Sequence, residues 1–329
     1  MKNAHSVPEP SRQADPPSSS RRSLFRLAAG SLLLTTLFGQ RSMAAAAATS
    51  SGGTGAAPGA WASGGTRRIG QAMSFPDPFT DSLESACRLI CSTTIGPCHT
   101  ASPERVDISD GWDGIPLRMA LRVVDEACRP VPDAIVEIWH TNYTGGYSGN
   151  IMRMCNNDPD DRERQFFRGY QCTDARGVVA FDTCYPGWYR GRAVHVHVRV
   201  QLGDYQADDR APSSVVTQLL FSDELNGRIF EEHALYQRFG QPDTTLETDG
   251  VVGGEADKTP YLFEVSRMDD GVMFAHKTLV VRQAMDEPLC RASGARWGGR
   301  GPMGGPGGPP PGGDRRMPPP DGRFPSAGG

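Results

Sequence analysis

The segment at residues 194–200 constrains the fold more than any other, because it reads Val-His-Val-His-Val-Arg-Val. Strict alternation of apolar and polar side chains predicts a β-strand, in which residues two apart point to the same face. The valines would cover one face of a sheet, while His195 and His197 would project together from the other. The segment therefore predicts a layered β structure with two imidazoles at one point on its surface.

Further short apolar segments are separated by turns rich in Gly, Pro and Asp. They lie at 117–124, 134–139, 178–181, 215–221, 261–265 and 272–281. Many short strands with turn residues between them favour an antiparallel sandwich or barrel. We therefore predict an all-β fold with an antiparallel β-sandwich core, one short helical segment before it at 81–89, and disordered termini.

Composition divides the chain of 329 residues into four parts. Residues 1–48 contain the pair Arg21 and Arg22, an apolar stretch and an alanine cluster, which together predict a twin-arginine export signal. Residues 49–75 are rich in Gly, Ala, Ser and Thr and are predicted to be a flexible linker, and residues 76–290 are predicted to be the sandwich domain. Of the 39 residues in the tail at 291–329, 22 are Gly or Pro, so this tail is predicted to be disordered.

The signal predicts a periplasmic or secreted protein that uses the twin-arginine export machinery during transport.

The net charge of the whole chain is −4, but both terminal parts are basic. Between them lie 22 basic and 34 acidic residues, a net charge of −12. An acidic domain repels phosphate backbones, so nucleic acid is not expected as a partner. No apolar stretch is long enough to span a bilayer, so stable membrane insertion is not expected either.

The cysteines fit an oxidising destination, where disulfides are the default. Eight are present, at positions 87, 91, 98, 128, 155, 172, 184 and 290. Eight cysteines allow too many pairings for the sequence to assign any. A zinc site formed by Cys87, Cys91, Cys98 and His99 is an alternative, although these residues lack the usual Cys-x-x-Cys spacing.

Two tyrosines accompany the histidine pair. Tyr189 lies in the turn at 186–192, just ahead of His195, and Tyr147 lies in a Gly-rich turn after the segment at 134–139. Anionic oxygen donors beside imidazoles favour a hard, oxidised metal, and Fe(III) fits this set better than Zn(II) or Cu(I). A ferric ion lowers the pKa of a bound phenol far below its usual value of about 10, so both tyrosines can bind as tyrosinates.

The segments around these residues resemble the intradiol ring-cleavage dioxygenases, the family that includes catechol 1,2-dioxygenase and protocatechuate 3,4-dioxygenase. The likeness covers residues 87–249, about half of the chain. Its matching pieces are Thr94-Ile-Gly-Pro, Asp107-Ile, Gly114-Ile-Pro-Leu, Val124-Asp, Pro130-Val-Pro-Asp-Ala, Trp139-His, Gly145-Gly-Tyr-Ser, Phe167-Arg-Gly-Tyr-Gln, Thr173-Asp with Gly177, and Tyr185-Pro-Gly-Trp-Tyr-Arg-Gly-Arg, which leads to the histidine pair. The last of these pieces is the most specific.

The resemblance implies a complete site. It implies that the ligands of Fe(III) are Tyr147, Tyr189, His195 and His197. Tyr189 would also be the ligand that leaves the metal and accepts a proton, Arg192 the active-site arginine, and Gln218 the residue that supports it. The implied reaction is cleavage of a catechol-type ring by O2 between its two hydroxylated carbons, giving a cis,cis-muconate-type product.

One departure from the family pattern concerns the substrate pocket. Where relatives have an aromatic residue after their Gly-Pro motif, this chain has Cys98 and His99. The sequence therefore leaves the preferred catechol open, together with the oligomeric state, the disulfide pattern, the signal cleavage site and the role of the tail.

Two other interpretations compete with a ferric dioxygenase. A secreted transthyretin-like sandwich that binds without catalysis would share the segments 122–125 and 130–136, and only the set of two tyrosines and two histidines separates it from an enzyme. A cupin-like metal enzyme would need a further Glu and His, which the contexts of His233 and His276 do not suggest. We expect His140, at the end of a strand, to be structural or to lie behind the ligands.

Overall fold

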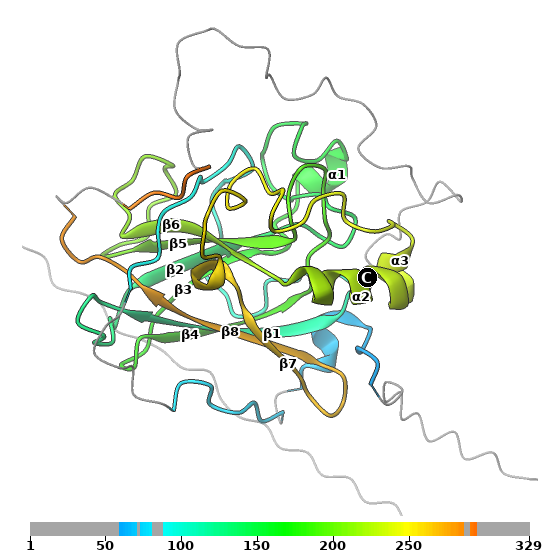
Figure 1. The fold of residues 1–329 in the computed structure, drawn as a ribbon, viewed down its shortest axis with the longest axis horizontal. Coiled ribbons are helices and arrows are strands. Elements are labelled where there is room, and N and C mark those ends of the chain that lie inside the picture. The colour runs from blue at the N-terminus through cyan, green and yellow to red at the C-terminus, as the bar shows by residue number, and fades with distance from the viewer. Residues whose placement is uncertain (1–58, 71–72, 81–87, 286–289, 295–329) are drawn as a thin grey trace, which may run out of the picture. The chain divides into compact units, whose positions relative to one another are not determined.

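The computed structural model describes residues 59–70, 73–80, 88–285 and 290–294. In this part of the chain, eight strands form two four-stranded sheets that lie as two layers (Figure 1). In spatial order, the first sheet contains β4 (Val178–Cys184), β1 (Pro116–Val124), β8 (Met273–Val280) and β7 (Glu264–Arg267), and the second contains β3 (Arg168–Cys172), β2 (Ile135–Trp139), β5 (His195–Gln201) and β6 (Val215–Leu220). The predicted all-β sandwich is confirmed.

The hydrophobic core lies between the two sheets. Val196, Val198 and Val200 of β5 are fully buried there, together with Val136 and Ile138 of β2. Because side chains alternate along a strand, placing these valines inside directs the intervening residues of β5 to the outer face of the second sheet. The candidate functional residues lie on that outer face.

Strand direction differs from the prediction at one pairing. β1 and β8 are parallel, whereas the other five pairings are antiparallel. A parallel pair requires a long connection, and here everything between Val124 and Met273 supplies it. Hydrophobic alternation predicts a strand and its buried face but carries no information about the direction of its partner, so this pairing could not be read from the sequence.

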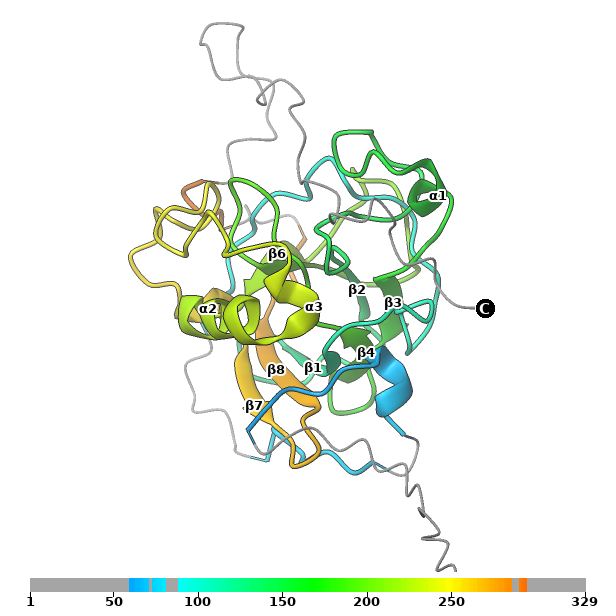
Figure 2. The same ribbon diagram turned by 90° about the vertical axis from the view of Figure 1, so that its right-hand side faces the viewer.

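Helices are few and short. They are α1 (Pro159–Arg162), α2 (Asp223–Glu232), α3 (Ala234–Gln237) and the 3-10 turns η1 (Gly65–Arg68) and η2 (Thr259–Tyr261). α2 and α3 lie at the end of the sheets that faces the viewer in Figure 2. The hydroxyl of Ser222 begins α2 by accepting the N–H of Leu225 at 3.2 Å, which satisfies one of the free donors of the first turn. No helix in the described ranges is both long and apolar enough to cross a membrane.

The folded domain begins earlier than composition predicted. Within the predicted linker at 49–75, the N–H of Ala62 donates to the carbonyl of Gly271 at 2.8 Å, and Thr66 is buried. Gly65 passes so close to the domain that an added Cβ would lie 2.3 Å from the carbonyl oxygen of Trp112. At Gly65, a small residue that resembles a linker in composition allows close packing.

The other predicted boundaries are only partly described. At the C-terminal end, Arg291 forms a bridge with Ser92 and Ala292 is buried, so the domain continues past residue 290. The predicted export signal at 1–48, most of the predicted helix at 81–89 and the tail from 295 onward lie outside the described residues.

Candidate metal centre

A row of polar and aromatic side chains crosses the outer face of the second sheet. His197 of β5 is paired with Trp139 of β2 on one side and with Gln218 of β6 on the other. Trp139 is in turn paired with Arg168 of β3. Directly opposed residues on one face lie about 5 Å apart, so these four side chains form one continuous row. All four are buried.

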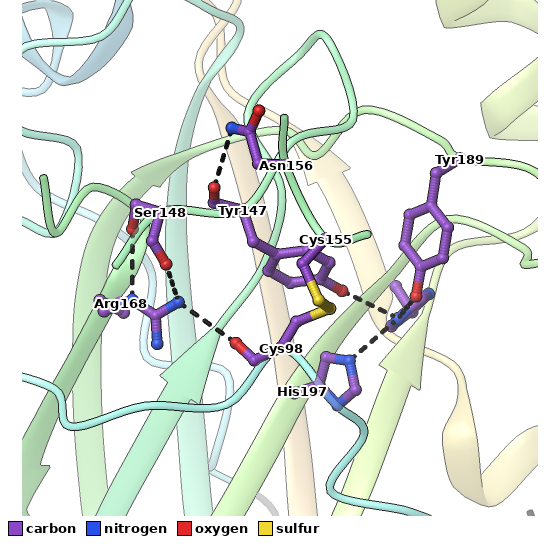
Figure 3. Close-up of a disulfide and its surroundings, with 9 residues drawn as sticks. Cys98, Tyr147, Ser148, Cys155, Asn156, Arg168, Tyr189 and His197 are labelled. Atoms are coloured by element: carbon purple, nitrogen blue, oxygen red, sulfur yellow. Dashed lines mark hydrogen bonds between the residues drawn. A yellow bond between two sulfur atoms is a disulfide. The ribbon is translucent and has the colours of Figure 1, made fainter. Parts of the chain in front are cut away.

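The four residues predicted as ligands converge beside His197 in this row. Figure 3 shows three of them, Tyr147, Tyr189 and His197, turned toward one point. The Nε2 atom of His195 lies 3.4 Å from the phenol oxygen of Tyr147, 3.3 Å from that of Tyr189 and 3.2 Å from Nε2 of His197. With metal bonds to nitrogen and oxygen of roughly 2.0–2.2 Å, neighbouring ligand atoms of one ion lie roughly 3.0–3.6 Å apart. The observed spacing therefore fits a single metal ion.

Protonation in this cluster also favours a cation. The Nδ1–H of His195 donates to the carbonyl of Ala193 at 2.7 Å, which leaves a lone pair on Nε2. Burial lowers the pKa of His195 to about 3 and the pKa of His197 well below its usual value, so both rings are neutral, the form that binds metals. Burial raises the pKa of the Tyr147 phenol well above its usual value, so ionising it requires a positive partner in the site.

Hydrogen bonds fix both the backbone N–H and the backbone carbonyl of Tyr147. Its N–H donates to the carbonyl of Cys155 at 3.3 Å, and its carbonyl accepts from the side-chain amide of Asn156 at 2.9 Å. A disulfide joins Cys155 to Cys98 on the segment that precedes the first sheet (Figure 3). The Tyr147 side chain is 2% exposed. Tyr147 is therefore enclosed, and its backbone is fixed by hydrogen bonds at both its N–H and its carbonyl.

Arg168 braces the same loop and was not predicted as a site residue. Its guanidinium is buried and donates to the carbonyl and hydroxyl of Ser148, to the carbonyl of Thr100 at 3.2 Å and to that of Cys98 at 3.4 Å. Burial lowers its pKa to about 10, so it remains a cation. The only signal in the sequence was its place in the family-like segment at 167–171.

The turn that carries Tyr189 is packed directly against the loop that carries Tyr147. The N–H of Gly187 donates to the carbonyl of Asn142 at 3.0 Å, and an added Cβ at Gly187 would lie 2.5 Å from the carbonyl oxygens of both Asn142 and Tyr143. Only glycine permits this approach. Tyr189 itself is partly exposed, whereas Tyr147 is buried.

Arg192 lies beside the four converging residues, with its guanidinium fixed at two points. Its Nε donates to the carboxylate of Asp249 at 2.9 Å, and its Nη2 donates to the amide oxygen of Gln218. The amide nitrogen of Gln218 donates to the carbonyl of Thr94 at 3.2 Å, which sets the orientation of the amide. The structure thus brings Arg192 and Gln218 together, as predicted, and adds Asp249, which sequence reasoning missed.

His99 and Cys98 occupy the position where the chain departs from its relatives. The Nδ1 atom of His99 lies 2.5 Å from a carboxylate oxygen of Asp209, and its Nε2 lies 3.1 Å from one of Glu137. The His99 ring packs edge-on against Trp139, with 4.7 Å between the ring centroids. His99 therefore packs against Trp139, the ring that also stacks on His197.

The cysteines follow the disulfide prediction and not the zinc alternative. Bonds join Cys91 to Cys290 and Cys98 to Cys155, and Cys128 is disulfide-bonded as well. Zinc ligation by Cys91 and Cys98 is therefore wrong. Cys87 lies outside the described residues, and Cys172 and Cys184 are free thiols.

The remaining histidines of the described ranges have partners in the fold. His140 donates from Nδ1 to the carbonyl of Thr141 at 2.8 Å and accepts at Nε2 from the hydroxyl of Thr183 at 2.8 Å. His233 lies 2.9 Å from the hydroxyl of Ser63, and His276 lies 4.0 Å from a carboxylate oxygen of Glu264. Within the described ranges no group of three or more His, Cys, Asp and Glu could hold a metal, so a cupin-like site lacks its ligands there.

Comparison with known proteins agrees with this geometry. The family model described as Dioxygenase matches residues 98–224, a range that contains all four converging residues. No curated protein sequence matches the chain. An intradiol ring-cleavage dioxygenase from Tetranychus urticae is 25% identical, with a TM-score of 0.52 over 62% of this chain and 98% of its own.

Two bacterial structures are similar at lower scores. The dioxygenase domain of a carbohydrate-binding fusion protein from Streptomyces sp. SirexAA-E is 24% identical, with a TM-score of 0.39 over 63% of this chain and 100% of its own. A hydroxyquinol 1,2-dioxygenase from Pseudomonas putida DLL-E4 is 20% identical, with a TM-score of 0.42 over 60% of this chain and 68% of its own. The family match and the likeness to the Tetranychus enzyme support an oxidoreductase of the dioxygenase type.

Proposed function

We propose that the protein is a non-haem Fe(III) dioxygenase that cleaves a catechol-type ring with O2 between the two hydroxylated carbons, releasing a cis,cis-muconate-type product. The observation that carries this proposal is the convergence of the two phenol oxygens of Tyr147 and Tyr189 on the ring nitrogens of His195 and His197. Two anionic oxygens with two imidazoles suit Fe(III) better than Zn(II) or Cu(I). The dioxygenase match over the same residues supports the reaction class.

The two tyrosines are suited to different tasks. Tyr147 is enclosed and held through its backbone, so it serves as a permanent ligand. Tyr189 is partly exposed in a surface turn, so its oxygen can swing away and accept a proton from an incoming catechol hydroxyl. Releasing one anionic oxygen as an anionic substrate arrives keeps the net charge of the buried site nearly constant, which avoids an uncompensated charge in a medium of low dielectric constant.

Arg192 is placed to stabilise charge on the substrate. Among the described residues, its Nη1 group has no protein acceptor, whereas Nε and Nη2 are engaged by Asp249 and Gln218. The chemistry that Fe(III) supplies in such a site is withdrawal of electron density from a chelated ring, which makes a ring carbon reactive toward O2. A fixed guanidinium beside that ring stabilises the negative charge that develops there.

Metal analysis combined with the visible spectrum tests the proposal. The purified protein should contain about one iron per chain and be wine-red, because tyrosinate bound to Fe(III) absorbs visible light. The spectrum should change on anaerobic addition of catechol, and the product should be the intradiol one. His195→Ala and His197→Ala should each lose the iron and the colour. A colourless protein filled with zinc would overturn the proposal, and a protein that neither binds metal nor forms product would support the transthyretin-like binding module.

We also propose that the protein is exported in folded form to the periplasm or beyond. The paired Arg21 and Arg22 carry this proposal, and the disulfides support it because such bonds persist in oxidising compartments. Replacing both arginines by lysine should leave the protein in the cytoplasmic fraction. Unchanged export of that variant would contradict the assignment of the signal.

A further inference from the structure

We propose that Asp249 is a positioning residue of the reaction, because it holds both Arg192 and the segment that orients His195. This inference rests on the proposed function. Asp249 lies after α2 and α3, 57 residues beyond Arg192 in the chain. Its side chain is 0% exposed. Burying a carboxylate is costly unless its oxygens are fully hydrogen-bonded, so the bonds that it accepts indicate its role.

Both oxygens of Asp249 are engaged twice. One oxygen accepts the backbone N–H groups of Val251 at 2.9 Å and Val252 at 3.0 Å. The other accepts the Nε–H of Arg192 and the backbone N–H of Ala193, both at 2.9 Å. A carboxylate has about four lone-pair positions, and all are used. The Arg192 cation and these N–H groups hold the pKa of the carboxyl below its usual value, although burial acts in the opposite direction.

The first consequence concerns the plane of the guanidinium. Asp249 fixes the Nε edge of Arg192 and Gln218 fixes one terminal nitrogen, so the remaining terminal nitrogen points in a single direction. Losing one of the two anchors would leave rotation about the side-chain bonds unrestrained. A displacement of about 1 Å between a charge and its reacting centre can cost on the order of 100-fold in rate.

The second consequence concerns His195. Ala193 donates its N–H to Asp249, and its carbonyl accepts the Nδ1–H of His195 at 2.7 Å. One carboxylate therefore orients both a cation beside the substrate and the residue that sets the tautomer of a ligand ring. Partners of this kind behind metal-binding histidines commonly affect metal affinity by 10- to 100-fold.

Asparagine cannot replace Asp249 in this arrangement. Its NH2 group would face either Val251 and Val252 or Arg192 and Ala193, and in both orientations it would meet N–H donors. Asp249→Asn therefore removes an anchor while changing the volume very little. The variant removes the charge that holds Arg192, and the control described next separates this effect from any loss of the turn at Val251 and Val252.

The chain provides a matched control in Asp125. This residue is 2% exposed, and one of its oxygens accepts the N–H groups of Ala127 at 2.9 Å and Arg129 at 2.8 Å. Its other oxygen accepts the Nε–H of Arg129 at 2.8 Å. The Asp125 turn follows β1 and repeats the bonding of Asp249, but none of its partners belongs to the metal centre. Asp125→Asn should therefore lower stability in a similar way without affecting the reaction.

The experiment compares Asp249→Asn, Asp125→Asn and the wild type as full-length, iron-loaded enzymes. We expect Asp249→Asn to lower kcat for catechol by about 10- to 100-fold, with a smaller change in the affinity for catechol measured anaerobically from the visible spectrum. In an Arg192→Lys background the same substitution should lower kcat by less than about 2-fold, since residues that act through one another are not additive. Asp125→Asn should keep the wild-type kcat.

Equal losses of kcat in the two asparagine variants, or an effect of Asp249→Asn that multiplies with that of Arg192→Lys, would overturn the inference. If Asp249→Asn does not fold, Asp249→Glu keeps the charge but moves it by one methylene, and it should retain iron while losing turnover; full turnover in that variant would contradict the proposal. A wild type without iron or catechol cleavage refutes the proposed function itself, an outcome separate from any difference among the variants.

Discussion

Trp139 lies flat against His197, with 4.8 Å between the two ring centroids and 9° between the ring planes. An added Cβ at Gly96 would lie 3.3 Å from Cε1 of His197, so the backbone also passes close to this ring. His99 in turn packs edge-on against Trp139. Ring packing therefore orients the His197 side chain, in addition to its hydrogen bonds.

Trp139→Leu should release that ring. We expect the affinity for iron to fall by about 10- to 100-fold and the free energy of unfolding to fall by about 3 kcal/mol. Trp112→Leu is the matched control, because Trp112 is also buried but packs on Phe166 in the sandwich core. It should lose a similar amount of stability and keep its iron. Titration of the iron-free proteins with iron, together with urea unfolding, measures both effects, and an unaltered affinity in Trp139→Leu would refute a role for stacking.

The two tyrosines should respond differently to loss of the hydroxyl. Tyr189→Phe should keep iron and a tyrosinate band from Tyr147, but bind catechol slowly and turn over about 100-fold or more slowly, because the internal base is gone. Tyr147→Phe should bind iron weakly, since it removes the enclosed ligand. Stopped-flow absorbance with catechol, with and without O2, separates the two steps. Near-normal kinetics in Tyr189→Phe would exclude it as the base.

The two disulfides provide a second matched pair. Replacing both cysteines of Cys98–Cys155 by serine should weaken iron binding and shift the visible band, because Cys155 and Cys98 accept hydrogen bonds from Tyr147 and Arg168. The Cys91–Cys290 pair closes 199 residues instead of 57, so its removal should cost slightly more stability, with about 4–5 kcal/mol expected for each bond. Its spectrum should stay unchanged. Identical spectra for the two variants would show that the Cys98–Cys155 bond has no specific influence on the centre.

Acid should destabilise the fold through His140. Burial lowers its pKa to about 4, whereas in the unfolded chain the value is roughly 6.5. The unfolded state therefore binds the proton first, and stability falls as the pH drops from about 6.5 toward 4. Between pH 7 and pH 5 the contribution amounts to about 2 kcal/mol. In His140→Gln, urea unfolding at these two pH values should show a difference smaller by about that amount, and an unchanged difference would assign the acid sensitivity to other groups.

The parts of the site that the sequence could predict are those encoded by short local patterns, namely strand alternation and Gly-rich turns. The alternation around His195 and His197 places both rings on one face, and the Gly-rich turns mark the loops that carry Tyr147 and Tyr189. The roles of Arg168 and Asp249 could not be predicted, because their partners lie far away in the chain. Arg168 contacts segments 20 and about 70 residues distant, and Asp249 reaches Arg192 across 57 residues. Such contacts form only after the sheets have assembled.

Disulfide pairing was unpredictable for the same reason. Spacing alone does not bring Cys91 next to Cys290, since the strands between them determine which segments meet. The predicted linker at 49–75 differs from the structure for another reason, because it includes residues that pack in the folded domain. Composition made the residues in and before η1 look unstructured, although Gly65 lies where an added Cβ would meet the carbonyl of Trp112 and Ala62 donates a backbone hydrogen bond to Gly271.

The parallel pairing of β1 with β8 has a consequence for synthesis of the chain. β1 lies in the interior of its sheet, yet one of its two neighbours is made about 150 residues later. Until Met273 and the strand that it begins have left the ribosome, an apolar strand keeps a bare edge, and such edges recruit other chains. Truncation anywhere before that strand should therefore yield aggregates rather than a smaller soluble fragment.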